Sequence, residues 1–342
     1  MAHLHPEDRA GPGADTLKLG IYLDLRNPPP WRRSWSTLYG ETLELCEEAE
    51  RLGADSVWLS EHHLFEDGYL PQPLTMAAAV AARTSRVRVG TAVVLPALRH
   101  PVHIAEEAAV VDLISGGRLE LGLGAGYRVP EYRLFDADVN RRYGSTDSRV
   151  RELRRLWAAG EVTPPPVQDP VPIWLGYHGP HGARRAGRLG EGLLSLDPAQ
   201  LEPYRAGLAE GGHDLSTARV SGMINGFVSD DPDRDWPWVA EHLRYQWDSY
   251  RGYMFEGTEH PRPKPIDPDQ WRQRGFSSGS THFVYDTPER TAAILNDALR
   301  DSPVTHVFFW ASLAGMPIDR VHRHVELLCT KLRPLLDNSS AE

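Results

Sequence analysis

A carboxylate and two imidazoles stand together in Glu61-His62-His63, directly after the apolar run 56–59. In parallel-barrel enzymes the catalytic side chains lie at the carboxyl ends of the strands, where this triplet falls if 56–59 is a strand. Imidazole titrates near neutral pH, so either histidine could move a proton or donate a hydrogen bond. Because successive strand residues point to opposite faces, only one of His62 and His63 can face the mouth of a barrel. The alternative is a polar strand end with no chemical role.

A zinc site is a competing interpretation of the same histidines. Zinc needs three or four ligands, and no obvious carboxylate or third histidine completes a set with His62 and His63. His322 and His324 lie far away in sequence, on the last predicted helix, and are expected to face solvent. We therefore expect no metal.

Apolar runs alternate with helical patterns along the whole chain. The eight predicted strands are 18–23, 56–60, 87–95, 119–123, 172–176, 192–196, 220–228 and 304–310. Strands that are apolar on both faces indicate a parallel sheet covered on both sides. A doubly wound open sheet is the rival, but the glycines of 122–126 do not have the Gly-x-Gly-x-x-Gly spacing of that fold. The pattern favours an α/β fold of the (β/α)8, or TIM-barrel, type.

The remaining segments are interpreted around this barrel. Residues 17–337 are expected to form one barrel domain between a disordered arm (1–16) and a disordered tail (338–342). The alternation of strands and helices is interrupted between predicted strands seven and eight. The intervening segment, 230–287, is rich in aromatic residues and proline and ends in the glycine- and serine-rich stretch 275–280. Such an insertion at the active-site end of a barrel is typical of a lid or binding loop. An oligomer contact is the alternative.

Charge and cysteine content restrict the partners and the compartment. The 342 residues carry a formal net charge of -10, which argues against nucleic acid or an anionic membrane as partner. Cys46 and Cys329 fall in helical patterns far apart, which predicts two reduced thiols in a cytoplasmic protein. No targeting segment is recognised, and no apolar stretch approaches the ~20 residues of a membrane helix.

In order and spacing, the strand ends resemble those of the bacterial-luciferase-like flavin monooxygenases over roughly residues 17–335. The segments that carry the resemblance are 60–64, 87–96, 119–127 and 172–177. The resemblance implies a (β/α)8 barrel that takes reduced FMN from a separate flavin reductase, traps O2 as a flavin peroxide and oxygenates a small organic substrate. His62 matches the luciferase histidine that is required for productive chemistry. Glu61 or His63 is then expected to orient it.

Strands three and four are expected to contribute to the flavin site. A flavin needs an apolar wall and backbone donors for its polar edges. Gly122, Gly124 and Gly126 would let the backbone approach a ligand, or serve only a tight bend of the barrel. The resemblance places a non-prolyl cis peptide behind the flavin ring at Ala92–Val93. It also shows that Ala125 stands where the luciferases hold an arginine.

The flavin phosphate is expected after strand five, at His178-Gly179-Pro180-His181-Gly182. A glycine-containing turn that enters a helix presents N–H groups and the positive end of the helix dipole to an anion, although an ordinary capped turn has the same sequence pattern. The resemblance implies hydroxyl donors at the positions of His178 and His181 and a serine at the position of Ser195. Only Ser195 is retained, which leaves open which flavin binds.

Tyr127, His100 and Trp310 occupy strand ends or the loops after them, where they either contact the substrate or pack.

Two alternatives to the flavin monooxygenase function remain. A deazaflavin-dependent oxidoreductase would share the barrel and the glycine-rich fourth strand, but the retained Glu-His-His favours the oxygen-using branch. The second alternative is a non-catalytic flavin-binding protein. Luciferase relatives of that kind have lost parts of the barrel, whereas this chain keeps eight strand-then-helix units. We expect a homodimer.

Overall fold

Eight parallel strands close into a barrel in the computed structural model, which describes residues 17–274, 283–300 and 302–336. The strand order around the barrel is β1-β10-β7-β6-β5-β4-β3-β2, so the predicted (β/α)8 barrel is confirmed and the open doubly wound sheet is excluded. The barrel strands are β1 (Lys18–Leu23), β2 (Ser56–Leu59), β3 (Arg88–Thr91), β4 (Leu119–Leu123), β5 (Ile173–Leu175), β6 (Gly192–Leu194), β7 (Val220–Ile224) and β10 (Val304–Trp310).

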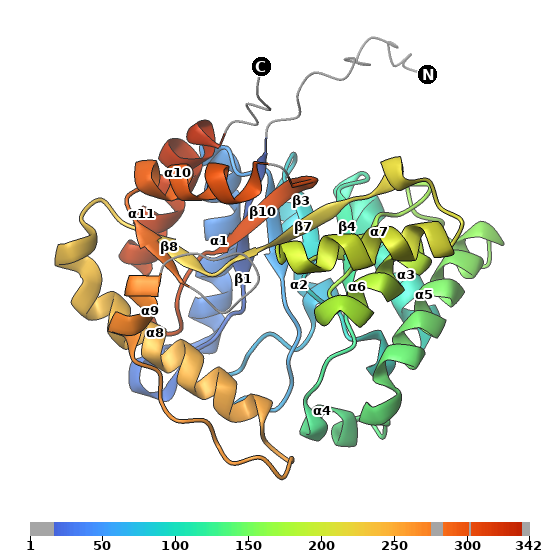
Figure 1. Cartoon of the computed structure of the whole chain (residues 1–342), viewed down its shortest axis with the longest axis horizontal. Helices are drawn as coiled ribbons and strands as arrows, with labels where there is room; N and C mark the ends of the chain where they lie inside the picture. Colours follow the sequence, from blue (N-terminus) through green and yellow to red (C-terminus); the bar gives the residue numbers. More distant parts are fainter. Residues whose placement is uncertain (1–16, 275–282, 301, 337–342) are drawn as a thin grey trace.

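Helices surround the barrel and cover the outer faces of its strands (Figure 1). The described helices, including those at the barrel mouth, are α1 (Trp35–Leu52), α2 (Pro73–Arg83), α3 (Pro101–Ser115), α4 (Val129–Leu134), α5 (Arg142–Ala158), α6 (Gly179–Arg188), α7 (Leu201–Glu210), α8 (Pro232–Met254), α9 (Pro268–Arg274), α10 (Pro288–Leu299) and α11 (Ile318–Leu327). Several begin at a proline, whose fixed φ and missing N–H suit the first helical turn. None of the described helices is long and apolar enough to cross a bilayer.

Two predicted strands differ from the structure by more than one or two residues. The third ends at Thr91, and the chain rejoins the sheet only through a single bridge from Val94 to Leu123. The seventh divides at Asn225: β7 stays in the barrel, while β8 (Gly226–Val228) leaves it and pairs with β9 (Val284–Asp286) in a separate two-stranded sheet. An apolar run reports burial on both faces, but it does not report which sheet supplies the neighbours.

The longest element of the segment predicted as a lid or binding loop is helix α8, which has 23 residues. The chain enters β1 at the top of Figure 1, and α4 and the C-terminal end of α8 lie at the bottom, at the carboxyl ends of the strands. α9 comes after an extended stretch, and the glycine- and serine-rich end at 275–280 lies outside the described residues.

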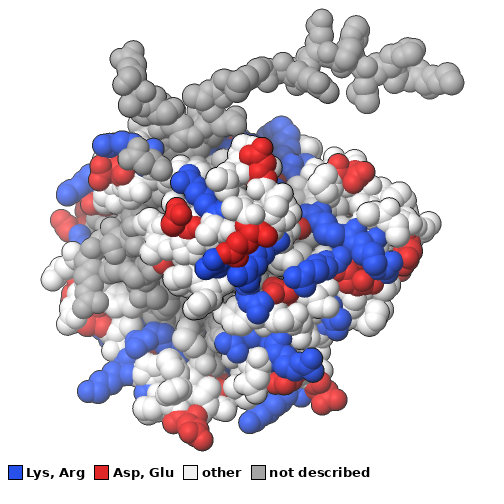
Figure 2. All heavy atoms as spheres, turned by 45° about the vertical axis from the view of Figure 1, so that its right-hand side comes forward, with Lys and Arg blue, Asp and Glu red and all other residues white. Residues whose placement is uncertain are grey.

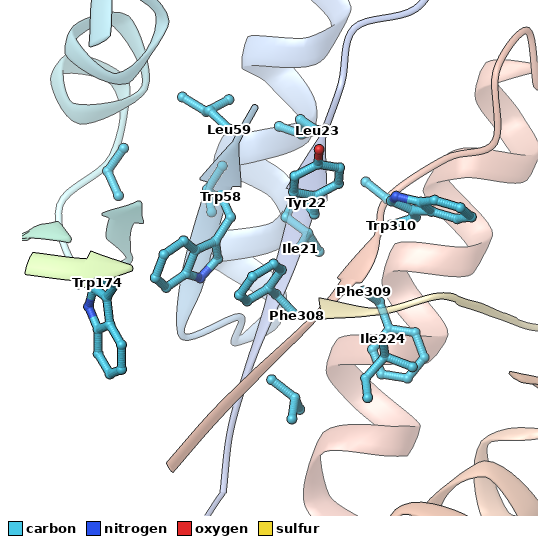
Figure 3. Packing of buried hydrophobic residues seen from close by; sticks show 14 of the residues in the cluster. Ile21, Tyr22, Leu23, Trp58, Leu59, Trp174, Ile224, Phe308, Phe309 and Trp310 are labelled. Atoms are coloured by element: carbon cyan, nitrogen blue, oxygen red, sulfur yellow. The ribbon is translucent and has the colours of Figure 1, made fainter. Parts of the chain in front are cut away.

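Aromatic rings fill the middle of the barrel. Trp58 stacks on Phe308 with ring centroids 4.6 Å apart and meets Trp174 edge-on at 6.5 Å. Glycines on neighbouring strands make room, since a Cβ at Gly90 would lie 2.4 Å from Trp58 and one at Gly192 2.4 Å from Trp174. Figure 3 shows the Trp58 and Phe308 rings beside each other within this core. The barrel is therefore packed, and a ligand must bind at its mouth.

Polar side chains at the amino end of the barrel pair with one another. Ser56 Oγ lies 3.0 Å from His306 Nε2, and Glu120 accepts a 2.6 Å hydrogen bond from Trp174 Nε1 while it pairs with Arg88. Burial lowers the pKa of His306 to about 4, so its ring is neutral at pH 7. We call these five residues the base network.

His324 is buried, so the prediction that it faces solvent is wrong. Its side chain hydrogen-bonds the main chain on both sides: Nε2 lies 2.9 Å from the Trp310 carbonyl, and the Val228 N–H donates to Nδ1 at 3.1 Å. Burial lowers its pKa to about 4. Both cysteines are free and buried, as predicted. Among the described residues no group of three or more His, Cys, Asp or Glu could hold a metal ion.

Candidate active site

A cavity of about 680 Å³ lies at the carboxyl ends of the barrel strands, and the C-terminal half of α8 covers one side of it. Strand ends provide Tyr22, Tyr127, His178, Leu194, Ser195, Leu196, Asp197, Met223, Asn225 and Trp310. Loops and α8 provide Tyr69, Gln200, Gln246, Trp247, Tyr250, Met254, Phe255, Thr258 and His260. The volume is in the range of small-molecule and cofactor sites.

His62 lies directly behind the wall of this cavity, enclosed by aromatic rings. Its ring centroid is 4.7 Å from that of Tyr69, 5.8 Å from Tyr127 and 5.7 Å from Tyr250, and all three tyrosines line the cavity. Phe65 closes another side at 4.9 Å. His62 is 8 % exposed, and it lines a second, shallower hollow with His63, Leu64 and Trp35. The three tyrosines therefore lie between the imidazole and the main cavity.

Glu131 is the group that orients His62. Its Oε1 lies 2.8 Å from His62 Nδ1 and accepts a 2.9 Å hydrogen bond from the main-chain N–H of His63. The side chain of Glu131 is fully buried, and Arg128 lies 3.8 Å away. Arg128 also bonds the His63 carbonyl and pairs with Glu256 beyond the end of α8, which links α4 to the cavity roof.

Glu61 and His63 serve a different part of the mouth. His63 Nε2 lies 2.9 Å from Glu61 Oε1, and the other Glu61 oxygen accepts a 2.9 Å hydrogen bond from the Leu95 N–H. Arg99 completes the set at 2.9 Å from Glu61. Neither residue hydrogen-bonds the His62 imidazole, so the prediction that one of them orients it is wrong. Glu61 instead fixes the loop after β3, because it accepts hydrogen bonds from the Leu95 N–H and from Arg99.

Four tyrosine hydroxyls meet at the same end of the cavity. Tyr22 and Tyr69 have hydroxyl oxygens 3.1 Å apart, and Tyr127 donates a hydrogen bond to Tyr250. Burial raises the pKa of each of the four phenols. They remain protonated at physiological pH and act as hydrogen-bond donors or acceptors.

A buried ion pair fastens α8 to the mouth. Arg26 lies 2.7 Å from Asp67, with both side chains almost fully buried, and its guanidinium also donates to the Gln246 carbonyl at 3.1 Å. The Gln246 amide in turn donates to Asp24 at 2.9 Å. Burial raises the pKa of Asp24, and the Arg26 charge opposes that rise. The middle of α8 is therefore part of the fixed wall of the cavity.

The Ala92–Val93 peptide bond is cis, at the position that the family resemblance implied. The neighbouring glycines accommodate the chain itself: a Cβ at Gly124 would lie 2.4 Å from Val93, and one at Gly122 only 1.7 Å from the Thr91 carbonyl oxygen. Gly126 has φ +60° and lies against Leu95. Neither the cis peptide nor Gly124, Ala125 or Gly126 is among the residues that line the cavity. The bend of the barrel explains these glycines without a ligand.

The predicted phosphate site is only partly assembled in the cavity wall. Ser195 and His178 line the cavity, whereas His181 is exposed outside its lining. Gly182 packs against Tyr177, where a Cβ would lie 2.7 Å from the tyrosine Cβ. Gly179 begins α6 with φ +72° and open space around it. The backbone N–H groups of this turn and the Ser195 hydroxyl are thus the donors that an anion could use.

Positive charge near this turn is already neutralised. Arg184 and Arg188 of α6 pair with Glu210, and Arg185 pairs with Asp147. On the face drawn in Figure 2, basic side chains likewise lie beside acidic ones. The surrounding protein lowers the pKa of His178, so its imidazole is neutral at pH 7. An anion here would rely on dipoles instead of a counter-ion.

Of the three predicted substrate contacts, two line the cavity and one does not. Tyr127 and Trp310 line the cavity. His100 is exposed and caps α3, where its Nδ1 accepts a hydrogen bond from the Val102 N–H. This capping hydrogen bond accounts for a histidine at the start of α3, and His100 is not part of the cavity wall.

Several buried polar atoms in the cavity wall have no partner. Within the described residues these are Asn225 Oδ1, Gln200 Oε1 and Trp247 Nε1, and Glu131 Oε2 lies nearby behind the tyrosines. Buried polar groups in native proteins are nearly always paired. Unpaired atoms gathered around one cavity therefore indicate a ligand that completes their hydrogen bonds. Sequence reasoning missed Glu131, Asn225 and Trp247, and only the position of Glu131 just after the glycine-rich strand could have suggested it.

Comparison with known proteins places this barrel in a family. The family model for luciferase-like monooxygenases matches residues 20–304, well over half of the chain. The chain belongs to the luciferase-like monooxygenase family. Members of this family include FMN-dependent monooxygenases and oxidoreductases that use the deazaflavin F420.

Individual relatives of this luciferase-like chain fall in both groups. A flavin-dependent trigonelline monooxygenase, oxygenase component, from Acinetobacter baylyi is 34% identical over 162 residues, covering 42% of this chain and 44% of that protein. An F420-dependent glucose-6-phosphate dehydrogenase from Amycolatopsis mediterranei is 32% identical over 184 residues, covering 48% and 55%. The chain thus spans about half the length of these curated relatives. The monooxygenase RslO1 from Streptomyces bottropensis superposes with a TM-score of 0.76 at 26% identity, covering 93% of this chain and 99% of that one.

Proposed function

We propose that the chain is the oxygenase of a flavin-dependent monooxygenase, which uses reduced FMN and O2 to oxygenate a small organic substrate. The observation that carries this proposal is His62, held 2.8 Å from the buried Glu131 and set behind the tyrosines of a cavity at the barrel mouth. The barrel retains all eight strands, which argues against a non-catalytic flavin-binding role. RslO1, a monooxygenase of matching length, supports the oxygen-using branch.

The chemistry of the cavity wall suits a flavin. Asn225 and Gln200 hold unpaired polar atoms of the kind that meet the polar edge of an isoalloxazine. Ser195 and the backbone N–H groups at the start of α6 are the donors for a phosphate. When bound, reduced FMN would supply the electrons that activate O2.

The residues around His62 define what the protein itself contributes. Glu131 Oε1 accepts a hydrogen bond from the His63 N–H, so it also accepts from His62 Nδ1 and leaves Nε2 of a neutral ring free to take a proton. Glu131 therefore positions the ring, and His62 holds or moves the proton. The rings of Phe65 and the tyrosines exclude water, which strengthens every polar contact inside.

A deazaflavin-dependent oxidoreductase is the second candidate, favoured by the F420-dependent dehydrogenases among the relatives. Both cofactors can be titrated into the protein and followed by tryptophan fluorescence, because Trp247 and Trp310 line the cavity. We expect reduced FMN to quench at micromolar concentration and F420 to require at least about tenfold more. Tighter binding of F420 would replace the proposal with the dehydrogenase-like function.

A separate flavin reductase and a second copy of the chain complete the proposal. The chain offers no nicotinamide-binding fingerprint of the Gly-x-Gly-x-x-Gly type, so reduced flavin would come from another protein. Helix α3 exposes Val110, Leu113 and Ile114 at 45%, 39% and 46%, an apolar strip suited to a homodimer contact. Sedimentation velocity should show a dimer, and Leu113→Glu should shift it to the monomer. A monomer at all concentrations would remove this part.

A further inference from the structure

The cavity has two chemically different ends. The first, which we call the β6 end, is formed by His178, Ser195, Asp197 and Gln200 beside the start of α6. The second, the aromatic end, is formed by a contiguous set of side chains that includes Tyr22, Tyr69, Tyr127, Trp247, Tyr250, Met254, Phe255 and Trp310. If the β6 end takes the cofactor phosphate, the aromatic end contributes to the substrate site.

Neither lysine nor arginine is among the described residues that line the cavity. His260 is the titratable base at the aromatic end, with its ring centroid 5.8 Å from that of Phe255. The two buried arginines nearby are fully engaged: Arg26 with Asp67 and the Gln246 carbonyl, and Arg128 with Glu256 and the His63 carbonyl. An anion would lose its hydration here without gaining a lysine or arginine as counter-ion, which is unfavourable.

The electrostatics of α8 act in the same direction. Met254 and Phe255, at the C-terminal end of this 23-residue helix, line the cavity, so the partially negative end of the helix dipole lies at the wall. The phenols add no compensating charge, because burial raises their pKa and keeps them neutral. A negatively charged group at this end would be repelled.

The same side chains favour a flat ring. Trp247 lies with its ring centroid 5.7 Å from Trp310 and 6.1 Å from Tyr250, in tilted and edge-on arrangements typical of aromatic contact. Trp247 is 7 % exposed, and its Nε1 donor has no partner. An oxygen on a bound ring would satisfy this donor, and the ring itself would stack on the neighbouring faces.

We propose that the substrate is a planar aromatic molecule that carries no negative charge and presents a carbonyl or hydroxyl oxygen to Trp247. This inference rests on the proposed function of the same site. It separates the chain from the glucose 6-phosphate named for its dehydrogenase relatives, because a phosphate would find no lysine or arginine at the aromatic end. It also predicts that straight-chain substrates bind weakly, since they cannot use the ring faces.

Isothermal titration calorimetry with four probes tests the proposal without any turnover. We expect naphthalene-2-carboxamide to bind about tenfold or more tightly than 2-naphthoate, which differs in its charge, and more tightly than decanal or glucose 6-phosphate. The affinity for the carboxamide should persist when FMN is saturating. Equal or tighter binding of 2-naphthoate, decanal or glucose 6-phosphate would overturn the proposal. So would the absence of carboxamide binding, or its displacement by FMN.

Trp247→Phe removes the unpaired donor and keeps an aromatic ring. We expect it to weaken carboxamide binding by several-fold to about tenfold, the effect of one hydrogen bond. Trp35→Phe is the matched control, because Trp35 is 42% exposed and does not line the cavity. Unchanged affinity in Trp247→Phe would remove the donor role. If neither FMN nor F420 binds while the carboxamide does, the proposed function fails and the preference for aromatic ligands stands.

Discussion

The two ends of the barrel both bury a histidine among polar groups, but only one end leaves polar atoms unpaired around a cavity. At the amino end, His306 and its neighbours in the base network bond one another, with the Ser221 hydroxyl as an unpaired exception. At the carboxyl end, Asn225 and Trp247 line a cavity, and each has a buried polar atom without a partner. Because unpaired buried polar groups are costly, those in the cavity wall mark the place where a ligand belongs. The paired end stabilises the fold, and the unpaired end is available for function.

The largest expected difference between the ends is in activity. His62→Ala should lower oxygenation of a substrate by ~10²–10⁴, because a positioned proton-transfer group is lost, while flavin binding and folding stay nearly intact. Hydrogen peroxide release should rise in step. His306→Gln, at the base, should leave turnover per folded molecule unchanged. Full turnover in His62→Ala would remove this residue from the mechanism.

Glu131→Gln is expected to produce a smaller loss in the same direction. Glutamine keeps an acceptor for His62 Nδ1 and the His63 N–H but loses the negative charge, so we expect turnover to fall by about ten- to a hundredfold. Turnover equal to that of the unchanged protein would mean that the Glu131 charge does not contribute to the positioning of His62.

Ser195→Ala examines the β6 end of the cavity. Loss of one hydrogen bond to a charged phosphate is worth ~1.5–3 kcal/mol, so FMN affinity should fall roughly tenfold to a hundredfold while riboflavin affinity hardly changes. Because burial lowers the pKa of His178, any part of the FMN affinity that depends on its protonated form should be lost at a lower pH than for a free histidine. Equal loss for both ligands would mean that the phosphate lies elsewhere.

Acid sensitivity should come from the paired, fully packed histidines. His306 and His324 have pKa values lowered to about 4 by burial, so the unfolded chain binds more protons between pH ~4 and ~6.5. The free energy of unfolding is then greatest above pH ~6.5 and falls with acidification, by about 1.4 kcal/mol per pH unit for each histidine. Urea unfolding should be measured at several pH values in this range. In His306→Gln, the free energy of unfolding should fall less steeply with acidification, by about 1.4 kcal/mol per pH unit. An unchanged slope would contradict burial of the neutral ring.

The barrel could be predicted from the sequence because each strand is an apolar run followed by a helical pattern. The prediction is less accurate where a run is shared between two sheets, as at Asn225, since burial alone does not assign partners. His62 could be found from its place after a strand. Its partner Glu131 is 69 residues away and meets it only because β2 and β4 end at the same mouth. Gly124, in contrast, is predicted from the sequence to approach a ligand, although it makes room for Val93.

The central claim is that the mouth keeps polar groups for a ligand while the base uses them for stability, and one paired measurement tests it. Unfolding free energies and FMN affinities should be measured for Asn225→Leu and Glu120→Gln. We expect Asn225→Leu to leave stability without ligand unchanged or raised and to weaken FMN binding. Glu120→Gln should lower stability by about 1–3 kcal/mol, because it leaves Arg88 without its charge partner, and should leave binding intact. If Asn225→Leu destabilises the protein as much as Glu120→Gln and binds FMN normally, the account is contradicted.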